Sequence, residues 1–124
     1  MTNTPNRGLV QPARGEIWYV RFDPQVGSEI NKIRPAVVVS PASIGRLPLR
    51  IVVPVTDWKP GYSKIPWFTF VPATPTNGLS KDSGADAFQV KSVSLERFKS
   101  RVGMVSSVQM DEIVASVALC VGYP

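Results

Sequence analysis

Residues 15–40 read GEIWYVRFDPQVGSEINKIRPAVVVS, and this stretch decides the fold of the 124-residue chain. Its first part, Glu16–Phe22, alternates two sets of side chains with the period of a half-buried strand. A polar loop, Gln25–Ile33, follows and ends at Arg34 and Pro35. Pro35 suits the start of a strand because it has no N–H to offer a neighbouring strand. We therefore predict strands over residues 16–22 and 36–40, joined by a polar loop.

Strand patterns continue along most of the chain. A nearly continuous apolar run at 49–56 predicts a central strand, and shorter runs predict strands at 67–71, 87–93 and 101–105, with a turn or single helical turn at 94–98. The polar connections at 57–65 and 72–84 carry the turn residues and are where we expect substrate specificity to lie. Residues 1–13 are expected to form a flexible arm and residues 14–124 a single domain.

One helix is predicted, and it closes the chain. Ser106 and Gln109 have the spacing of a capping box, and Gly122 stands where a helix should end. Between them apolar residues recur at helical spacing: Met110, Ile113, Val114, Val117 and Val121. Many short strands and one terminal helix indicate a mainly β protein, a small and strongly curved antiparallel barrel with the helix packed across it.

The composition excludes several chemistries. The chain has no histidine and one cysteine, Cys120, which excludes catalytic triads and pairs that need histidine, histidine-ligated zinc and an internal disulfide. Cys120 lies among apolar residues, so we expect a buried, inert thiol. No signal peptide or membrane-length run is evident, so a cytoplasmic protein is expected. The net charge of +5 favours a polyanionic partner, although many small proteins carry such a charge without one.

Three motifs together resemble a known family. Gly27-Ser28-Glu29, Arg34-Pro35 and Val53-Pro54-Val55-Thr56 are similar to the corresponding segments of the MazF/PemK (Kid) toxin endoribonucleases, and the resemblance extends from about Gly15 to Gly122. It implies an SH3-like barrel that forms a homodimer and an acidic, MazE-like antitoxin as partner. It also implies cleavage of single-stranded mRNA by internal 2′-hydroxyl attack without a cofactor or metal.

The resemblance assigns catalytic roles to residues whose chemistry suits them. Cleavage without metal or histidine needs a group that neutralises charge on the phosphoryl oxygens, and a guanidinium is always charged and offers a planar fork of donors. The family's catalytic arginine and threonine match Arg34 and Thr56. Its glutamate matches Glu29, which is expected to orient the guanidinium or, as the less favoured alternative, to accept a proton. Without the family, Arg34 and Thr56 would each be read as ordinary structural residues.

Six further residues are predicted to bind RNA: Lys32, Trp58, Asp86, Phe88, Gln89 and Lys91. Trp58, beside Thr56, is the expected platform for stacking a base. Several family members have an aspartate immediately before the glutamine that matches Gln89, and this chain has Phe88 there. Asp86 would share a face with Phe88 if both lay on one strand, so either Asp86 substitutes or Phe88 stacks on a base instead.

Two other functions are compatible with the same barrel. A CcdB-like toxin binds a protein target such as DNA gyrase and cleaves nothing. CcdB proteins end in an apolar Trp-Gly-Ile, whereas this chain ends in Val-Gly-Tyr-Pro, which together with Arg34 and Thr56 disfavours this alternative. An inactive member of the family is the second alternative, and Phe88 is its only indication.

Overall fold

The computed structural model describes residues 9–24, 26–30, 32–45 and 47–123. In chain order its elements are β1 (Glu16–Arg21), β2 (Ile33–Val38), β3 (Leu49–Asp57), the 3₁₀ turn η1 (Pro60–Lys64), β4 (Phe68–Val71), β5 (Ser83–Asp86), the turn η2 (Ala87–Gln89), β6 (Lys91–Ser94), the turn η3 (Leu95–Arg97), β7 (Phe98–Met104) and α1 (Ser107–Cys120). The chain is therefore mainly β with a C-terminal helix, as the sequence predicts.

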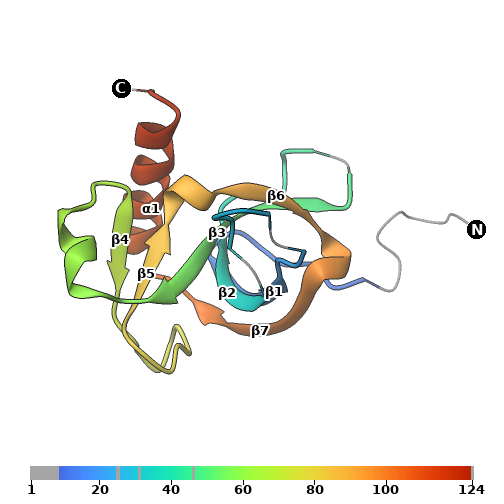
Figure 1. Cartoon of the computed structure of the whole chain (residues 1–124). Coiled ribbons are helices and arrows are strands. Elements are labelled where there is room, and N and C mark those ends of the chain that lie inside the picture. Colours follow the sequence, from blue (N-terminus) through green and yellow to red (C-terminus); the bar gives the residue numbers. More distant parts are fainter. Residues whose placement is uncertain (1–8, 25, 31, 46, 124) are drawn as a thin grey trace, which may run out of the picture.

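The strands form one antiparallel sheet that curls strongly on itself (Figure 1). Its order is β4-β5-β3-β2-β1-β7, with β6 paired to β3 off this path. β3 is the central strand because it pairs with β2 along one side and with β6 and then β5 along the other. The apolar run at 49–56 marked this position, since a strand covered on both faces has no polar side.

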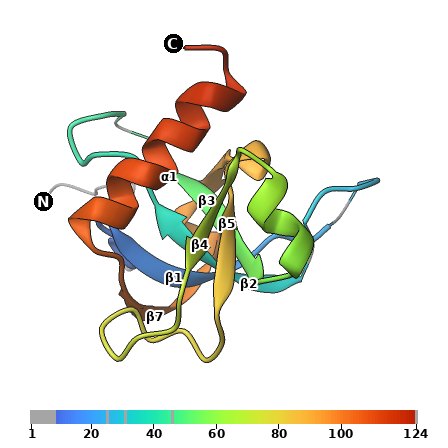
Figure 2. The ribbon, with the colours of Figure 1, turned by 90° about the vertical axis from the view of Figure 1, so that its left-hand side faces the viewer.

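Apolar side chains are buried on both faces of the curled sheet. Inside the curl, β1, β2, β3 and β6 contribute residues such as Trp18, Val20 and Val52 to one cluster. Across the other face lies α1, whose Met110 and Ile113 pack with Ile17 and other strand residues in a second cluster (Figure 2). Burial of each such aliphatic side chain stabilises the fold by about 1.5–3 kcal/mol. No helix among the described residues is long and apolar enough to cross a membrane.

The helix begins and ends where the sequence predicts, but its cap differs in one contact. Ser106 accepts a hydrogen bond from the backbone N–H of Gln109 at 3.1 Å. In a complete capping box the Gln109 side chain would return to Ser106. Here its amide donates instead to the carbonyl of Phe70, at 3.5 Å, so it connects α1 to β4. Gly122 follows the helix at φ +76°, the left-handed conformation that glycine adopts readily.

The predicted strand over residues 87–93 is correct only at its end, since residues 91–93 belong to β6 and Ala87–Gln89 form the turn η2. Val55 lies opposite Ala85 and Val52 lies opposite Lys91, so residues 86–90 face only Val53 and Pro54 of β3. The surplus residues cannot fit a regular ladder, and they form the outward turn η2 between β5 and β6. The expected second strand also starts earlier, at Ile33 rather than residue 36.

Residues 9–13, expected to belong to the flexible arm, lie against the sheet. Arg50 donates to the carbonyl of Pro12 at 2.8 Å and to the side chain of Gln11 at 3.2 Å. Glu16 accepts from the N–H of Ala13 at 2.7 Å and pairs with Arg101 at 2.8 Å. Residues 1–8 of that expected arm lie outside the described residues.

Gly103 marks a close approach of β7 to the loop after β4, and this contact generates a stability prediction. A Cβ at Gly103 would lie 2.3 Å from the carbonyl oxygen of Asn77, which is backbone and cannot move away cheaply. Gly103→Ala should therefore lower the free energy of unfolding by about 3 kcal/mol. Urea unfolding measures the effect. Gly61→Ala, where the added Cβ meets nothing within 4 Å, is the control, and equal stability of the two variants would contradict the packing described.

Candidate active site

The candidate site lies at the open end of the barrel interior. β2 and β3 pair with Ala36 opposite Pro54 and Val38 opposite Val52, and these side chains belong to the interior cluster or adjoin it. Because side chains two residues apart share a face, the same register continued two residues further brings Arg34 opposite Thr56. The interior column of side chains is thus apolar until its last pair, which is an arginine and a threonine.

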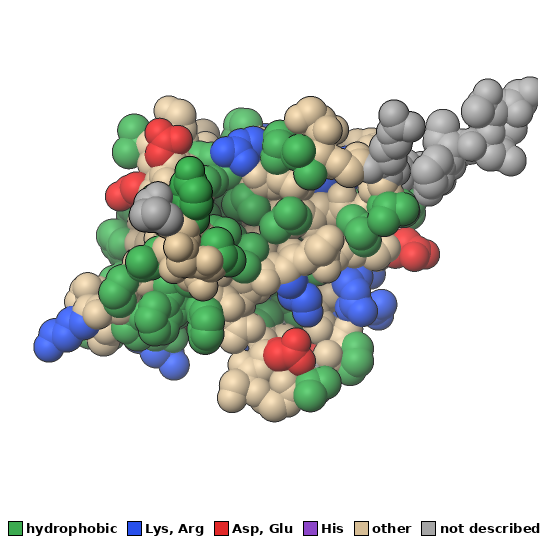
Figure 3. All heavy atoms as spheres, turned by 90° about the horizontal axis from the view of Figure 1, so that it is seen from above, with side chains coloured by type: hydrophobic (Ala, Val, Ile, Leu, Met, Phe, Trp, Pro, Cys, Tyr) green, Lys and Arg blue, Asp and Glu red, His purple; other side chains and the backbone are tan. Residues whose placement is uncertain are grey.

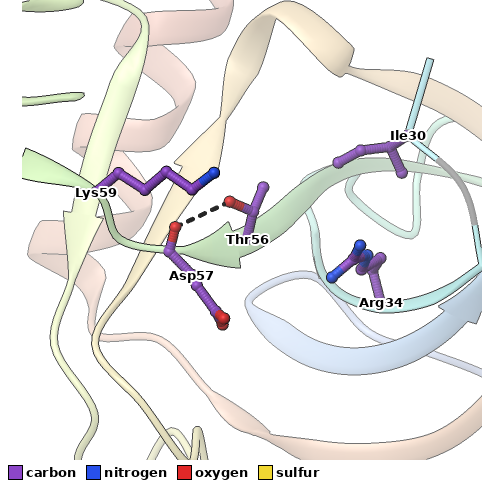
Figure 4. A pocket seen from close by; sticks show the side chains of 5 residues that line it. All are labelled: Ile30, Arg34, Thr56, Asp57 and Lys59. Atoms are coloured by element: carbon purple, nitrogen blue, oxygen red, sulfur yellow. Dashed lines mark hydrogen bonds between the residues drawn. The ribbon is translucent and has the colours of Figure 1, made fainter. Parts of the chain in front are cut away.

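A pocket of about 190 Å³ opens at this polar end, and it is lined by Ile30, Arg34, Thr56, Asp57 and Lys59. Figure 4 shows Arg34 approaching from β2 while Lys59 reaches from the segment after β3 toward Thr56. Two cationic side chains and one hydroxyl therefore converge on one small space. Such a group suits an anion the size of a phosphodiester.

Thr56 is held at the end of β3 by the strand on its other side. Its backbone lies opposite Gly84 of β5, and its hydroxyl donates to the carbonyl of Asp57 at 3.1 Å. The Asp57 carboxylate points away from Thr56 in Figure 4 and pairs with Lys81 at 3.4 Å, in a contact open to solvent. The charge of Asp57 in the pocket wall is therefore partly neutralised by Lys81, which lies outside the pocket.

The loop between β1 and β2 forms one wall. Ile30 lines the pocket and also packs against the interior cluster. Glu29 precedes it and is exposed, outside the set of residues that line the pocket. The loop closes at its base through two backbone contacts of Lys32, whose carbonyl accepts from Phe22 and whose N–H donates to the Asp23 side chain, both at 2.8 Å. Lys32 itself is exposed.

The turn η2 separates the residues that the sequence grouped on one strand. Asp86 ends β5, and its carboxylate accepts the N–H of Phe88 at 3.1 Å, so it caps the turn. Phe88 is 69% exposed, with its ring 5.5 Å from that of Trp67. The expectation that Asp86 and Phe88 share a strand face is therefore wrong. Gln89 extends from the turn to the β1–β2 loop, where its amide bonds to the backbone of Ser28 and Ile30.

Burial affects the ionisation of two groups beside this turn. Burial raises the pKa of the Asp86 carboxyl, and the bond from the Phe88 N–H offsets part of that rise. Burial also raises the pKa of the Cys120 thiol, and the nearby Asp86 carboxylate raises it further. A thiol with a raised pKa is mostly protonated at neutral pH, which agrees with an inert cysteine. The expectation that Cys120 is buried is wrong, because the residue is only partly buried and lines a hollow beside Trp67 and Phe88.

Trp58 lies in an aromatic cluster rather than in the pocket wall. Its ring meets the edges of Tyr62 and Phe70, with centroids 5.7 and 4.8 Å away. Gly84 leaves room for it, since a Cβ there would lie 3.0 Å from the Trp58 ring. Phe68 stacks on Tyr62, with ring centroids 4.0 Å apart, whereas Trp67 contacts Phe88, so Trp67 and Phe68 face different partners although they are adjacent in the sequence.

The predicted site residues thus fall into separate places. Arg34 and Thr56 meet in the pocket, and Glu29 and Gln89 belong to the adjoining loop and its support. Lys91 lies on β6, with its amine 5.9 Å from the centre of the Phe22 ring. Sequence reasoning missed three lining residues, Ile30, Asp57 and Lys59. Lys59 had a usable signal, because it is a cation three residues after Thr56, but the adjoining Pro60-Gly61 marked it only as part of a turn.

The described residues contain no group of three or more cysteine, aspartate or glutamate side chains arranged to hold a metal ion. The side chains that line the pocket are dominated by donors, namely those of Arg34, Thr56 and Lys59. The charged donors among them, the guanidinium of Arg34 and the ammonium of Lys59, bind anions and repel cations. The arrangement can therefore hold an anionic group and stabilise added negative charge on it.

Comparison with known proteins identifies the family. Residues 13–121 match the family described as PemK-like, MazF-like toxin of type II toxin–antitoxin system. Endoribonuclease MazF9 of Mycobacterium tuberculosis is 37% identical over an alignment 112 residues long that covers 86% of this chain and 92% of that protein. Endoribonuclease toxin MazF of Escherichia coli is 33% identical over an alignment 113 residues long that covers 90% of this chain and 95% of that protein.

Solved structures of MazF proteins and related endoribonucleases have the same fold as this chain. MazF from Deinococcus radiodurans superposes with a TM-score of 0.76 at 26% identity, covering 90% of this chain and 96% of that one. A mycobacterial endoribonuclease in complex with its cognate antitoxin shares the fold, with a TM-score of 0.70 at 19% identity over 92% of this chain and 98% of that one. The chain therefore belongs to the MazF/PemK family of toxin–antitoxin endoribonucleases.

The position of Asp86 generates a pH prediction. Its folded-state pKa is raised above the ordinary value of 3.8, so its contribution to stability is fully present below that value and is lost as pH rises through the folded pKa. Asp86→Asn keeps an oxygen for the Phe88 N–H and carries no charge. The variant should therefore gain stability relative to the wild type between about pH 3 and pH 7.

Urea unfolding at both pH values measures this gain. Asp111→Asn, which removes an exposed carboxylate on α1, controls for the change in net charge. If the stabilities of Asp86→Asn and Asp111→Asn, each relative to the wild type, changed equally with pH, burial of Asp86 would not be the cause of the gain.

Proposed function

We propose that this chain cleaves single-stranded mRNA in the pocket between Arg34 and Thr56 without a metal or other cofactor, as the toxin of a type II toxin–antitoxin pair. The 2′-hydroxyl of one nucleotide attacks the adjacent phosphorus. A new O–P bond forms as the bond to the 5′-oxygen breaks, the attacking hydroxyl loses its proton and the leaving oxygen gains one. The products carry a 2′,3′-cyclic phosphate and a 5′-hydroxyl. The observation that carries this proposal is the convergence of Arg34, Thr56 and Lys59 on one pocket.

Arg34 supplies the main electrostatic stabilisation. The phosphoryl oxygens gain negative charge as the transition state forms, and a fixed guanidinium stabilises that charge without reorganising. The side chain is half-buried, and the following Pro35 is paired across the sheet with Tyr19, so its base is rigid. A group fixed in advance accelerates the chemical step more than a mobile one.

Thr56 and Glu29 assist Arg34 in this proposal. The Thr56 hydroxyl turns from the Asp57 carbonyl to donate to a phosphoryl oxygen, and Lys59 contributes a second positive charge. Glu29, next to the lining residue Ile30, orients the guanidinium through a charge-assisted bond when RNA is bound. Orientation is favoured over proton abstraction because Glu29 lies outside the pocket wall, whereas a proton acceptor would have to reach the attacking 2′-hydroxyl inside the pocket.

RNA on either side of the scissile bond is bound by the remaining candidates. Lys32 and Lys91 are exposed cations suited to backbone phosphates, which position RNA without reading sequence. Phe88 is the most exposed aromatic among the candidates and offers a face for stacking a base, at about 1–3 kcal/mol. Trp58 is half-buried in its aromatic cluster and offers less free surface, although it remains a candidate platform.

Two protein partners follow from charge and surface. A chain of net charge +5 with a cationic pocket attracts an acidic antitoxin of the MazE type, which would block the pocket. At the C-terminal end of α1, Leu119 and Val121 are exposed, and such an apolar surface suits self-association. Hydrophobic side chains gather on this side of the molecule in Figure 3. We propose a homodimer that acts in the cytoplasm, where mRNA is available.

The alternative of a gyrase-binding toxin is not favoured. The two relatives reported above cover most of this chain and are named endoribonucleases. Arg34 and Thr56 meet in the pocket, and a gyrase-binding module requires neither residue. A binding module would need no arginine opposite a threonine at the mouth of the barrel.

The catalytic pair is tested by substitution. Arg34→Ala should reduce the cleavage rate at saturating RNA by about a hundredfold or more, because the lost interaction forms mainly in the transition state. Arg34→Lys should recover little, since an ammonium lacks the planar fork. Thr56→Ala should be severely impaired, and Thr56→Ser should keep part of the activity. The assay is steady-state cleavage of a defined RNA in EDTA.

Arg21→Ala is the matched control, because it removes an exposed arginine from the neighbouring strand β1. Circular dichroism checks that each variant is folded. Near wild-type cleavage by folded Arg34→Ala would show that Arg34 is structural and that the proposed mechanism is wrong.

A further inference from the structure

Gln89 uses both ends of its side-chain amide on the loop that carries Glu29. Its Oε1 accepts the backbone N–H of Ile30 at 3.3 Å, and its Nε2 donates to the backbone carbonyl of Ser28 at 3.3 Å. A backbone N–H can only donate and a carbonyl can only accept, so the two partners fix the orientation of the amide. Gln89 therefore spans the two residues that flank Glu29.

The base of Gln89 is itself anchored. It is the last residue of η2, which is capped by Asp86 at one end and closed by the Val90 N–H donating to Ala87 at 3.2 Å at the other. The N–H of Ala87 donates to the carbonyl of Trp67 at 3.1 Å, and Ala87 is 1% exposed. The turn thus presents Gln89 from a packed support to a loop whose Glu29 is exposed.

The loop residue that Gln89 holds forms part of the pocket. The backbone N–H of Ile30 donates to the Gln89 side chain, and the side chain of Ile30 lines the pocket with Arg34 and Thr56. A shift of Ile30 would change the shape of the pocket, and a shift of Ser28 or Ile30 would move Glu29 between them. Displacements of about 1 Å at such positions cost catalytic rate rather than binding alone.

We propose that Gln89 is a positioning residue of the reaction, which acts through the loop by holding Ile30 in the pocket wall and Glu29 beside it. The inference rests on the proposed function of that pocket. It also revises the expectation that Gln89 binds RNA, because the amide is already engaged by the chain. A residue that reads a base would instead keep its amide directed to solvent or to the pocket.

The structural part of the proposal is tested without RNA. Gln89→Met keeps the length of the side chain and removes both hydrogen bonds, whereas Gln89→Glu keeps an acceptor for Ile30 and loses the donor to Ser28. Amide hydrogen exchange of Ile30 in the full-length protein should accelerate by about tenfold in Gln89→Met. Ser92→Ala, an exposed change on the following strand, is the control and should leave this exchange unaltered. Unchanged exchange in Gln89→Met would overturn the proposal.

The catalytic part is tested by a double-mutant cycle. At saturating RNA, kcat of Gln89→Met should fall by about tenfold to a hundredfold, with KM changed much less. If Gln89 acts partly through Glu29, the loss caused by Gln89→Met should be smaller in a Glu29→Gln background than in the wild type. Fully additive losses would overturn the part of the proposal that runs through Glu29. A changed base preference with kcat intact would show that Gln89 contacts RNA directly and would overturn the positioning role.

The two proposals can fail separately. If the wild-type chain did not cleave RNA, the proposed function would be wrong, and the exchange experiment would still decide whether Gln89 holds the loop. If the wild type cleaved RNA and Gln89→Met cleaved it equally well, the function would stand and the positioning role would be wrong.

Discussion

The site depends on the backbone pairing of β3. This strand pairs with β2 on one side, and its other side pairs first with β6 and then with β5. The register with β2 decides which side chains share the barrel interior, and it brings Arg34 and Thr56 to the same end of it. A slip of one residue would turn Thr56 to the other face and bring Val55 or Asp57 into its position.

The change of partner along β3 has a second consequence. Where β5 ends and β6 has not begun, the surplus residues leave the sheet as η2 and project Gln89 toward the β1–β2 loop. One irregularity in the sheet therefore supports the loop at the pocket, while the regular pairing across β3 aligns the catalytic pair. The apolar column behind Arg34 and Thr56 excludes water from one side, which strengthens the interaction of the guanidinium with a bound anion.

Much of this arrangement could be predicted from the sequence. Apolar alternation and proline placement identified most of the strands, and the three motifs around Glu29, Arg34 and Thr56 identified the family. The turn η2 could not be predicted, because residues 87–93 contain no glycine or proline to mark a turn and the interruption arises where β3 changes its partner from β5 to β6. The engagement of Gln89 with residues 59 and 61 positions away was also invisible in a single sequence. Lys59 was overlooked because its turn context outweighed its charge.

The central claim is that the RNA supplies its own nucleophile in the pocket of Arg34 and Thr56. The most direct measurement compares two RNAs that differ only by a 2′-deoxyribose at the scissile nucleotide. The account predicts that the wild-type protein binds both with similar affinity and cuts only the all-ribose RNA, leaving a 2′,3′-cyclic phosphate. Cleavage of the 2′-deoxy substrate at the same bond would contradict it, because that substrate has no hydroxyl with which to attack.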